Sequence, residues 1–195
     1  MSKPRPFFPQ IIYCSKFKMP PKNIYYRIIY QFISKCHQQV LIAILLTEAR
    51  IKTKDIAILT PYNAQVANIR ESLFVKGMSD ITVNTIMKSQ GSEWKYVIMS
   101  TVRSCPKSDI ETQPTKSLII NRLGFIKDPH QVNVGITRAQ EGLCIIGNEN
   151  LLRCSVLWRG LLDHYKEKEC VVNPTRNIQV QKATRSLGMK KTARR

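Results

Sequence analysis

The sequence predicts an α/β fold with a mostly parallel sheet that helices cover on both faces. Short, fully apolar runs alternate with helical segments between residues 55 and 172, which is typical of buried parallel strands. The chain has 195 residues, 43% of them apolar, which is enough for one well-filled domain. The longest apolar run, Val40 to Leu46, is too short to cross a membrane, so no membrane partner is expected.

The first half of the chain predicts a helix, then strands separated by a second helix. Residues 1–22 are rich in Pro, Lys and aromatic residues and show no period, so a linker, a disordered arm or the remainder of something longer is expected. Residues 23–49 lack Pro and Gly and predict a helix. An amphipathic helix is predicted at 62–76, ended by Gly77. Strands are predicted at 55–60, 81–86 and 96–101.

The second half predicts a polar loop over 103–127, followed by further helices and strands. Pro129 suits the first turn of a short helix. A strand at 143–147, a helix at 157–168 and a last strand at 169–172 are then expected. These elements divide the chain into an N-terminal arm and helix (1–49), one domain (50–172) and a tail (173–195).

The positive charge is concentrated at the two ends of the chain. The formal net charge is +18, yet residues 48–172 carry 17 basic and 13 acidic side chains. Residues 1–47 and 173–195 each carry seven Lys or Arg and no acid. Cationic segments of this kind attract phosphate backbones without reading their sequence. The tail is therefore either a nucleic-acid contact or a solvated, disordered segment.

Six cysteines form no C-x-x-C pair, and the three histidines lie far apart. A zinc site is therefore not expected, and no metal ligand is assigned within this chain. The first residues lack the continuous apolar segment of a signal peptide. Reduced thiols in the cytoplasm or nucleus are expected.

The segment VNVGITRAQ (132–140) places Arg138 at the end of a helical turn, directly before an apolar strand. A fixed arginine beside a rigid strand suits a phosphoryl-transfer site, where catalysis consists mostly of positioning and charge neutralisation. The alternative is an ordinary solvated loop residue. Two further segments that precede it in order, ILTPYNAQ (58–65) and SQGSE (89–93), favour the functional interpretation.

Thr60 and Pro61 lie where a predicted strand ends and a helix begins. Open α/β sheets place ligands at such strand ends, and a helix start offers free backbone N–H groups to an anion. An anion such as a phosphate is therefore the expected ligand of Thr60 and Pro61. The alternative is a simple turn, because Pro is common at helix starts.

In the SQGSE segment, Gly91 lets the backbone approach a ligand closely because it has no Cβ. Gln90 can both donate and accept hydrogen bonds, which suits a nucleotide cleft. Trp94 and Tyr96, just beyond, are expected to pack rather than to stack on bases.

Together, ILTPYNAQ, SQGSEWKYVIMSTVRS and GFIKDPHQVNVGITRAQEGLCIIGN resemble the second RecA-like domain of superfamily 1 helicases of the Upf-like type. The resemblance covers roughly residues 50–172 and rests on three motifs in the family order. It implies a RecA-like fold of the P-loop NTPase class. Residues 1–45 match the family poorly.

The resemblance also implies roles for single residues. TPYNAQ corresponds to motif IV, which implies that Thr60 and Pro61 meet nucleic-acid phosphates. SQGSE corresponds to motif V, with Glu93 similar to the family glutamate that accepts from the nucleotide ribose. VNVGITRAQ corresponds to motif VI, and Arg138 matches the arginine finger that reaches the γ-phosphate. Arg103 stands at a family position that links the ATP and nucleic-acid sites, although a structural salt bridge is an equal alternative.

The implied activity is ATP-dependent translocation on single-stranded RNA or DNA. ATP would bind between this domain and a first RecA-like domain, supplied in cis or in trans. None of the eight glycines belongs to a G-x-x-x-x-G-K-[ST] segment, and no strand ends in paired acids, so Mg²⁺ and the phosphate grip are assigned to that first domain. As an isolated chain the enzyme is expected to be inactive. The alternative is a non-catalytic module that binds nucleic acid or protein.

Overall fold

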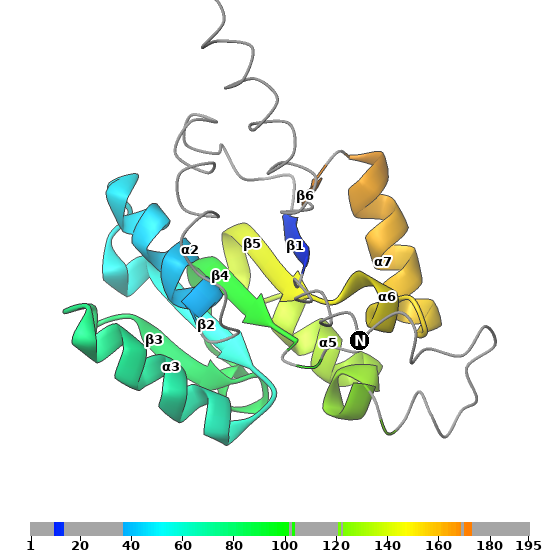
Figure 1. The fold of residues 1–195 in the computed structure, drawn as a ribbon, viewed down its shortest axis with the longest axis horizontal. Helices are drawn as coiled ribbons and strands as arrows, with labels where there is room; N and C mark the ends of the chain where they lie inside the picture. Colours follow the sequence, from blue (N-terminus) through cyan, green and yellow to red (C-terminus); the bar gives the residue numbers. More distant parts are fainter. Residues whose placement is uncertain are drawn as a thin grey trace, which may run out of the picture.

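Four parallel strands form the centre of a six-stranded sheet (Figure 1). The computed structural model describes residues 10–13, 37–101, 103, 121, 123–168 and 170–172. The parallel strands lie in the order β3, β2, β4, β5. They span Thr82–Thr85 (β3), Ile56–Thr60 (β2), Trp94–Ser100 (β4) and Ala139–Gly147 (β5). The predicted α/β class with a mostly parallel sheet is confirmed.

Two short strands extend the sheet beyond β5. Strand β1 (Gln10–Tyr13) pairs antiparallel with β5, placing Ile12 opposite Ile145. Strand β6 (Val171–Val172) pairs antiparallel with β1. The expectation of an arm or linker over 1–22 is therefore wrong for these four residues. Their pairing with β5 joins segments that are far apart in the sequence, so local sequence carries little sign of it.

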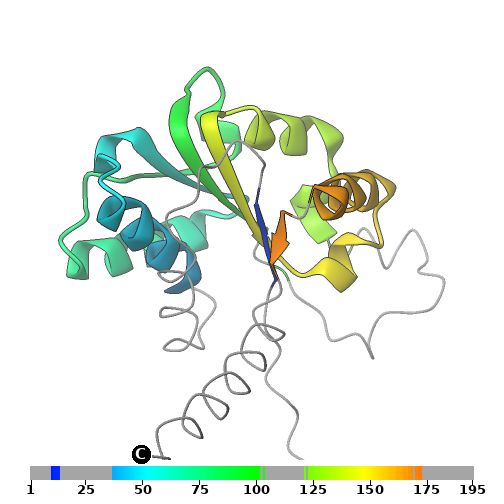
Figure 2. The same cartoon turned by 90° about the horizontal axis from the view of Figure 1, so that it is seen from above.

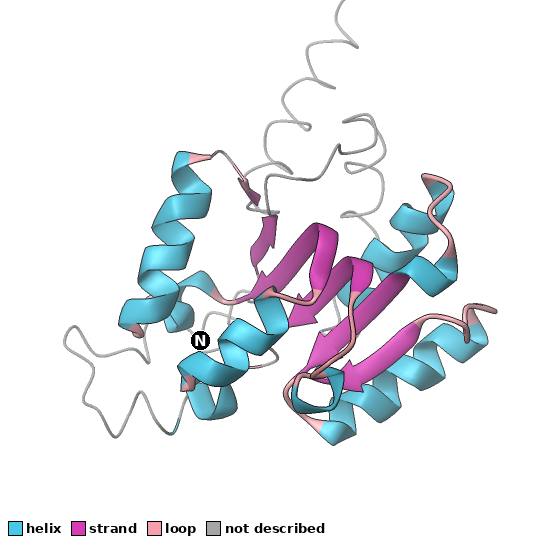
Figure 3. Cartoon of the chain, turned by 180° about the vertical axis from the view of Figure 1, so that it is seen from behind, coloured by secondary structure: helices cyan, strands magenta, loops and turns pink. Residues whose placement is uncertain are grey.

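Helices cover both faces of the sheet (Figures 2 and 3). One face carries α2 (His37–Glu48) and α3 (Asn63–Val75), which contact each other. The other face carries α5, α6, α7 and the 3₁₀ turns η2 and η4. These elements span Pro129–Ile136 (α5), Glu149–Leu152 (α6), Val156–Glu167 (α7), Met87–Ser89 (η2) and Gly124–Lys127 (η4). A further 3₁₀ turn, η1 (Thr53–Asp55), precedes β2.

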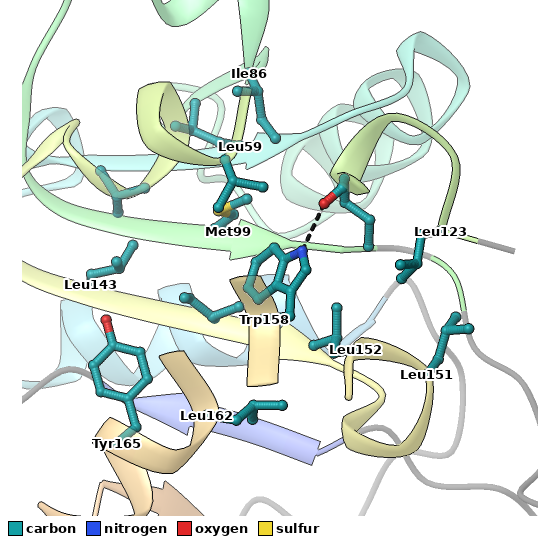
Figure 4. Packing of buried hydrophobic residues seen from close by; sticks show 14 of the residues in the cluster. Leu59, Ile86, Met99, Leu123, Leu143, Leu151, Leu152, Trp158, Leu162 and Tyr165 are labelled. Atoms are coloured by element: carbon teal, nitrogen blue, oxygen red, sulfur yellow. Dashed lines mark hydrogen bonds between the residues drawn. The ribbon is translucent and has the colours of Figure 1, made fainter. Parts of the chain in front are cut away.

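The sheet separates two hydrophobic cores because successive strand side chains point to opposite faces. Leu59 and Met99 pack with Trp158, Leu162 and other residues of the α5–α7 face (Figure 4). Their neighbours Ile58 and Ile98 pack with residues of α2 and α3, including Leu46, Ile69 and Leu73. Both faces of the central strands are therefore buried, as the continuous apolar runs predicted.

Trp158 joins α7 to η4. Its side chain is fully buried, and its indole N–H donates to the carbonyl of Ile126 at 2.6 Å (Figure 4). Leu123 and Ile126 are also buried. The end of the predicted 103–127 loop is therefore packed into the core, because its apolar side chains fill the space beneath α7.

The ends of two helices follow their sequence signals. Gly77 has a φ of +69°, the left-handed conformation that glycine adopts readily, and α3 ends just before it. Asp128 caps α5, since its carboxylate accepts from the backbone N–H of His130 at 2.9 Å. Pro129 then occupies the first turn, as predicted.

The proposed division of the chain stays a prediction at both ends. Helix α2, on the N-terminal side of residue 50, packs against the same core as α3. The tail, residues 173–195, lies outside the described residues. Within the described part of the chain, no helix is long and apolar enough to span a bilayer.

Candidate functional site

The residues singled out by the motifs gather at two ends of the parallel strands. We call the amino ends of β4 and β5, with the preceding residues 89–93 and 137–138, the amino edge. We call the carboxyl ends of β2 and β4, with residues 60–62, Arg103 and η4, the carboxyl edge. Helix α5 lies between η4 and residues 137–138, and its eight residues span about 12 Å.

Arg138 is fixed at the amino edge by three hydrogen bonds. Its Nε donates to the carbonyl of Val134 at 2.9 Å, at the end of α5. Its Nη1 donates to the carbonyl of Ser92 at 3.2 Å, and its Nη2 to the hydroxyl of Thr137 at 2.8 Å. Each guanidinium N–H points in a fixed direction, so these three partners set the orientation of the whole group. One N–H on each of Nη1 and Nη2 remains available to a ligand.

No described carboxylate lies within 4 Å of the Arg138 guanidinium. Its partners in the described part of the chain are carbonyls and a hydroxyl, which orient the charge without neutralising it. The side chain is half-buried. A cation held in this way suits an anionic ligand better than a solvated loop residue would, because its conformation is already set.

The SQGSE segment packs directly beside Arg138. The backbone N–H of Trp94 donates to the carbonyl of Arg138 at 3.0 Å, and Gln140 Nε2 donates to Glu93 Oε2 at 3.2 Å. Gly91 has a φ of +81° and open space where a Cβ would stand. Gln90 and Glu93 are exposed. The structure therefore brings Gln90, Gly91, Glu93 and Arg138 to one edge, and their role in a nucleotide site stays a prediction.

Tyr96, on β4, adds a polar contact near this edge. Its hydroxyl donates to Glu141 at 2.7 Å. This hydrogen bond, together with partial burial and the charges of Glu141 and Asp55, raises the pKa of the tyrosine. Trp94 is half-buried and packs against the core of the α5–α7 face, in agreement with the expectation that it packs.

At the carboxyl edge, Thr60 has an exposed fraction of 0%. Its hydroxyl donates to Gln65 Oε1 on α3, and Gln65 Nε2 donates to Ser100 Oγ at 3.2 Å. Gln39 Nε2 on α2 also donates to Ser100 Oγ, at 2.8 Å. Thr60 therefore does not touch solvent in this conformation, and its hydroxyl anchors the helix that follows. Pro61, beside it, is partly exposed.

Arg103 is exposed and faces the start of α3. Its Nε donates to the Tyr62 hydroxyl at 2.7 Å, and its Nη1 donates to the carbonyl of Asn121. The guanidinium carbon lies 5.5 Å from the centre of the Tyr62 ring, which is cation–π geometry. The alternative of a structural salt bridge finds no partner among the described residues, none of whose carboxylates lies within 4 Å of Arg103.

Local motifs did not identify Tyr62 or Phe125 as functional residues. Phe125 lies on η4 with its ring 5.6 Å from that of Tyr62, centre to centre, at an interplanar angle of 64°. Gly124 has a φ of +59°, and a Cβ there would stand 2.6 Å from the Tyr62 hydroxyl. The sequence signal that could have drawn attention to this group is Gly124 directly before the aromatic Phe125.

The described residues contain no group of three or more His, Cys, Asp or Glu side chains that could hold a metal ion. The amino edge instead carries groups that a polyphosphate and a ribose would need. They are the Arg138 guanidinium, the exposed backbone of Gly91, the Gln90 amide and the Glu93 carboxylate. The donor set fits a nucleotide and offers few oxygen ligands to its metal ion.

A family model described as an AAA domain matches residues 23–150. The chain is 54% identical over 138 residues to "3'-5' exoribonuclease HELZ2" of Mus musculus. The matched segment covers 71% of this chain and 5% of the relative. The human protein of the same name is 52% identical over 130 residues, covering 67% of this chain and 4% of the relative.

A more distant relative carries a helicase name. "ATP-dependent helicase NAM7" of Saccharomyces cerevisiae is 35% identical over 131 residues, or 64% of this chain and 12% of the relative. The chain thus spans a small fraction of the length of each of these relatives. The matched region contains all three motifs, the parallel sheet and both edges, and the chain belongs to the Upf1-like superfamily 1 helicases, as a C-terminal RecA-like domain.

Proposed function

We propose that this chain is the C-terminal half of an ATP-dependent RNA or DNA helicase, with Arg138 as the arginine finger. The observation that carries the proposal is the Arg138 guanidinium, which is oriented by Val134, Ser92 and Thr137 with no described carboxylate beside it. An oriented and unneutralised arginine is what the transition state of phosphoryl transfer requires.

In this proposal ATP binds between the amino edge and a first RecA-like domain, in cis or in trans. Glu93 accepts from the ribose, Gln90 and the backbone at Gly91 approach the nucleotide, and Arg138 reaches the γ-phosphate. Gln140, which donates to Glu93, would orient that carboxylate. Mg²⁺ accompanies the nucleotide, with its ligands supplied by the first domain and by the phosphates.

The carboxyl edge supplies part of the strand-binding surface. Pro61 and Arg103 lie on its exposed side, and the buried Thr60 positions the start of α3 through Gln65. Closing of the two domains on ATP, and their opening after hydrolysis, would move this surface along single-stranded RNA or DNA. Helix α5 connects the two edges and would transmit part of that motion.

The experiment is a nucleic-acid-stimulated ATPase assay of the full chain, alone and with a matching first RecA-like domain supplied in trans. We expect no hydrolysis by the chain alone and stimulated hydrolysis by the pair. Arg138→Ala should lower the stimulated rate on the order of 10³-fold, the effect of losing an arginine finger. Arg159→Ala is the matched control, because Arg159 also donates to a backbone carbonyl and has no described ion-pair partner.

A non-catalytic module that binds nucleic acid or protein is the second candidate. It is favoured by the absence of a G-x-x-x-x-G-K-[ST] segment from the 195 residues. The same assay separates the two candidates. If the first domain is not stimulated at all, the helicase proposal fails and the binding module remains. If Arg138→Ala hydrolyses ATP as fast as the unsubstituted pair, the assignment of Arg138 as the arginine finger is wrong.

A further inference from the structure

An exposed aromatic ring lies close to a cation that has no ion-pair partner among the described residues, at the carboxyl edge. Phe125 is 54% exposed, although large apolar side chains of the described residues are mostly buried. Its ring meets the Tyr62 ring at 64°, and Arg103 lies over the other ring of the pair, Tyr62. We call Tyr62, Arg103 and Phe125 the aromatic platform.

Hydrogen bonds and buried neighbours hold the aromatic platform in place. The Tyr62 hydroxyl accepts from Arg103 Nε, and Arg103 Nη1 donates to the carbonyl of Asn121. On the Phe125 side, the next residue, Ile126, is buried and its carbonyl accepts from the Trp158 indole. The Tyr62 ring is therefore fixed, and the backbone that carries Phe125 is held by its buried neighbour, which reduces the conformational freedom lost when a ligand binds.

Close packing around Gly124 fixes the approach of the rings. A Cβ at this position would stand 2.6 Å from the Tyr62 hydroxyl and 3.2 Å from the Arg103 guanidinium carbon. The absence of a side chain at Gly124 therefore lets η4 lie directly against Tyr62 and Arg103. This contact brings Phe125 to the same surface as a residue from the start of α3.

The charge of the platform favours an anionic ligand. Arg103 has no carboxylate within 4 Å among the described residues, and Lys127, two residues after Phe125, is exposed. The nearby Asp128 carboxylate accepts from the His130 backbone as the cap of α5. An exposed aromatic ring beside cations that have no ion-pair partner among the described residues matches a nucleobase attached to a phosphate backbone. An apolar protein partner would instead leave Arg103 buried without a described counterion.

We propose that the aromatic platform stacks a nucleobase of the single-stranded nucleic acid, with Phe125 as the stacking face and Arg103 at the adjoining phosphate. This inference rests on the proposed function and adds to it the residue that grips a base rather than the backbone. Stacking is tolerant of sequence because every base has an aromatic face. The platform would therefore hold any strand that passes the carboxyl edge.

The test measures the affinity of the full chain, without nucleotide, for a fluorescently labelled oligouridylate and for an abasic oligomer with the same number of phosphates. Fluorescence anisotropy at fixed salt gives the ratio of the two dissociation constants, which removes the purely electrostatic contribution of the basic segments. Oligothymidylate serves as the DNA arm. Phe125→Ala should weaken binding of the base-bearing oligomer roughly 5- to 100-fold and leave the abasic oligomer unchanged.

Two further variants separate stacking from general damage. Phe125→Tyr keeps an aromatic face and should restore the preference for bases. Phe74→Ala is the matched control, because Phe74 is 75% exposed and lies near the far end of α3 from Tyr62. It should leave both affinities unchanged.

The possible outcomes are distinct. Equal affinity for the base-bearing and abasic oligomers, or an unchanged ratio in Phe125→Ala, overturns the platform while leaving the ATPase proposal intact. A Phe125→Ala variant that keeps the base preference but loses stimulation by the first domain would place Phe125 in the domain interface and also overturns it. If the chain binds neither oligomer, both this inference and the nucleic-acid part of the proposed function are wrong.

Discussion

Two arginines mark the two edges of the sheet, and they are held in different ways. Arg138 is oriented by two backbone carbonyls and a hydroxyl, so its direction depends on the main chain of α5 and residues 89–93. Arg103 is oriented by the Tyr62 hydroxyl and the Asn121 carbonyl, over an aromatic ring.

This difference indicates different ligands. Carbonyl partners leave the Arg138 charge intact and directed, which suits one phosphate group at one place. The aromatic partner of Arg103 belongs to a pair of rings of which Phe125 is exposed, which suits a ligand that moves past and is held by stacking. The glycines near the two arginines also have different surroundings. A Cβ at Gly91 would meet open space, whereas one at Gly124 would meet Tyr62 and Arg103.

The largest effect on stability is expected from Gly124→Ala, with Gly91→Ala as its partner at the amino edge. Both glycines have positive φ, which costs another residue about 1–2 kcal/mol. Gly124→Ala adds a steric conflict with Tyr62, so its total cost should be about 2–4 kcal/mol, against about 1–2 kcal/mol for Gly91→Ala. Urea unfolding measures both.

The same pair should also separate the two edges by function. Gly124→Ala should reduce the affinity for single-stranded oligonucleotides, and Gly91→Ala should not. Equal losses of stability in the two variants would show that Tyr62 and η4 move apart easily, and the contrast between a packed and an open edge would then be wrong.

A smaller effect is expected from the buried polar network behind the carboxyl edge. Thr60→Val removes the donor to Gln65 Oε1 and leaves a buried amide oxygen unsatisfied, which should cost about 1–3 kcal/mol of unfolding free energy. Thr101→Val is the matched control, because the carbonyl of Ile146 that its hydroxyl reaches also accepts from the Thr101 backbone N–H. A Thr60→Val variant as stable as Thr101→Val would remove the anchoring role of Thr60.

The smallest predicted effect is a loss of folding stability at low pH, and it arises at a carboxylate that contacts neither Arg138 nor Arg103. Burial alone would raise the pKa of Glu149, but hydrogen bonds and charges from Lys166 and Arg153 outweigh it and lower the pKa. The stabilisation is therefore present above the ordinary glutamate pKa and is lost as the pH falls through the lowered value. Glu149→Gln should cost about 1 kcal/mol at pH 7 and reduce the loss of stability between pH 5 and pH 3.

The control for this prediction is Glu71→Gln, an exposed substitution on α3 without a described ion pair. Thermal unfolding at several pH values compares the two. Because neither Arg138 nor Arg103 has a described carboxylate partner, their hydrogen bonds should not contribute to the acid dependence. An unchanged pH profile in Glu149→Gln would refute the assignment of this carboxylate as an acid-sensitive contact.

The parallel sheet could be predicted from sequence because its information is local. Runs such as the one at 56–59 are apolar at every position, and Gly77 and Pro129 mark helix ends. The amino edge was predictable for the same reason, since Gly91 and Arg138 each lie in a short motif directly before a strand.

The remaining features depend on contacts between distant segments. Strand β1 is a short apolar run among Pro and Lys residues, and it becomes a strand by pairing with β5. Thr60 ends a strand and was expected to face a ligand, but Gln65, from the next helix, closes over its hydroxyl. Tyr62, Arg103 and Phe125 are far apart in sequence, and only the sheet and η4 bring them together.

The protein contains two tryptophans, and they lie in contrasting surroundings. Trp158 is sealed in the interior, while Trp94 is half-buried and its backbone N–H meets the Arg138 carbonyl. Indole emission moves to longer wavelength as water gains access, so the two rings should emit at different colours. Trp94 is thus an intrinsic fluorescent probe next to Arg138. A change in the Trp94 emission without a change in the Trp158 emission would report movement around Arg138 while the core stays folded.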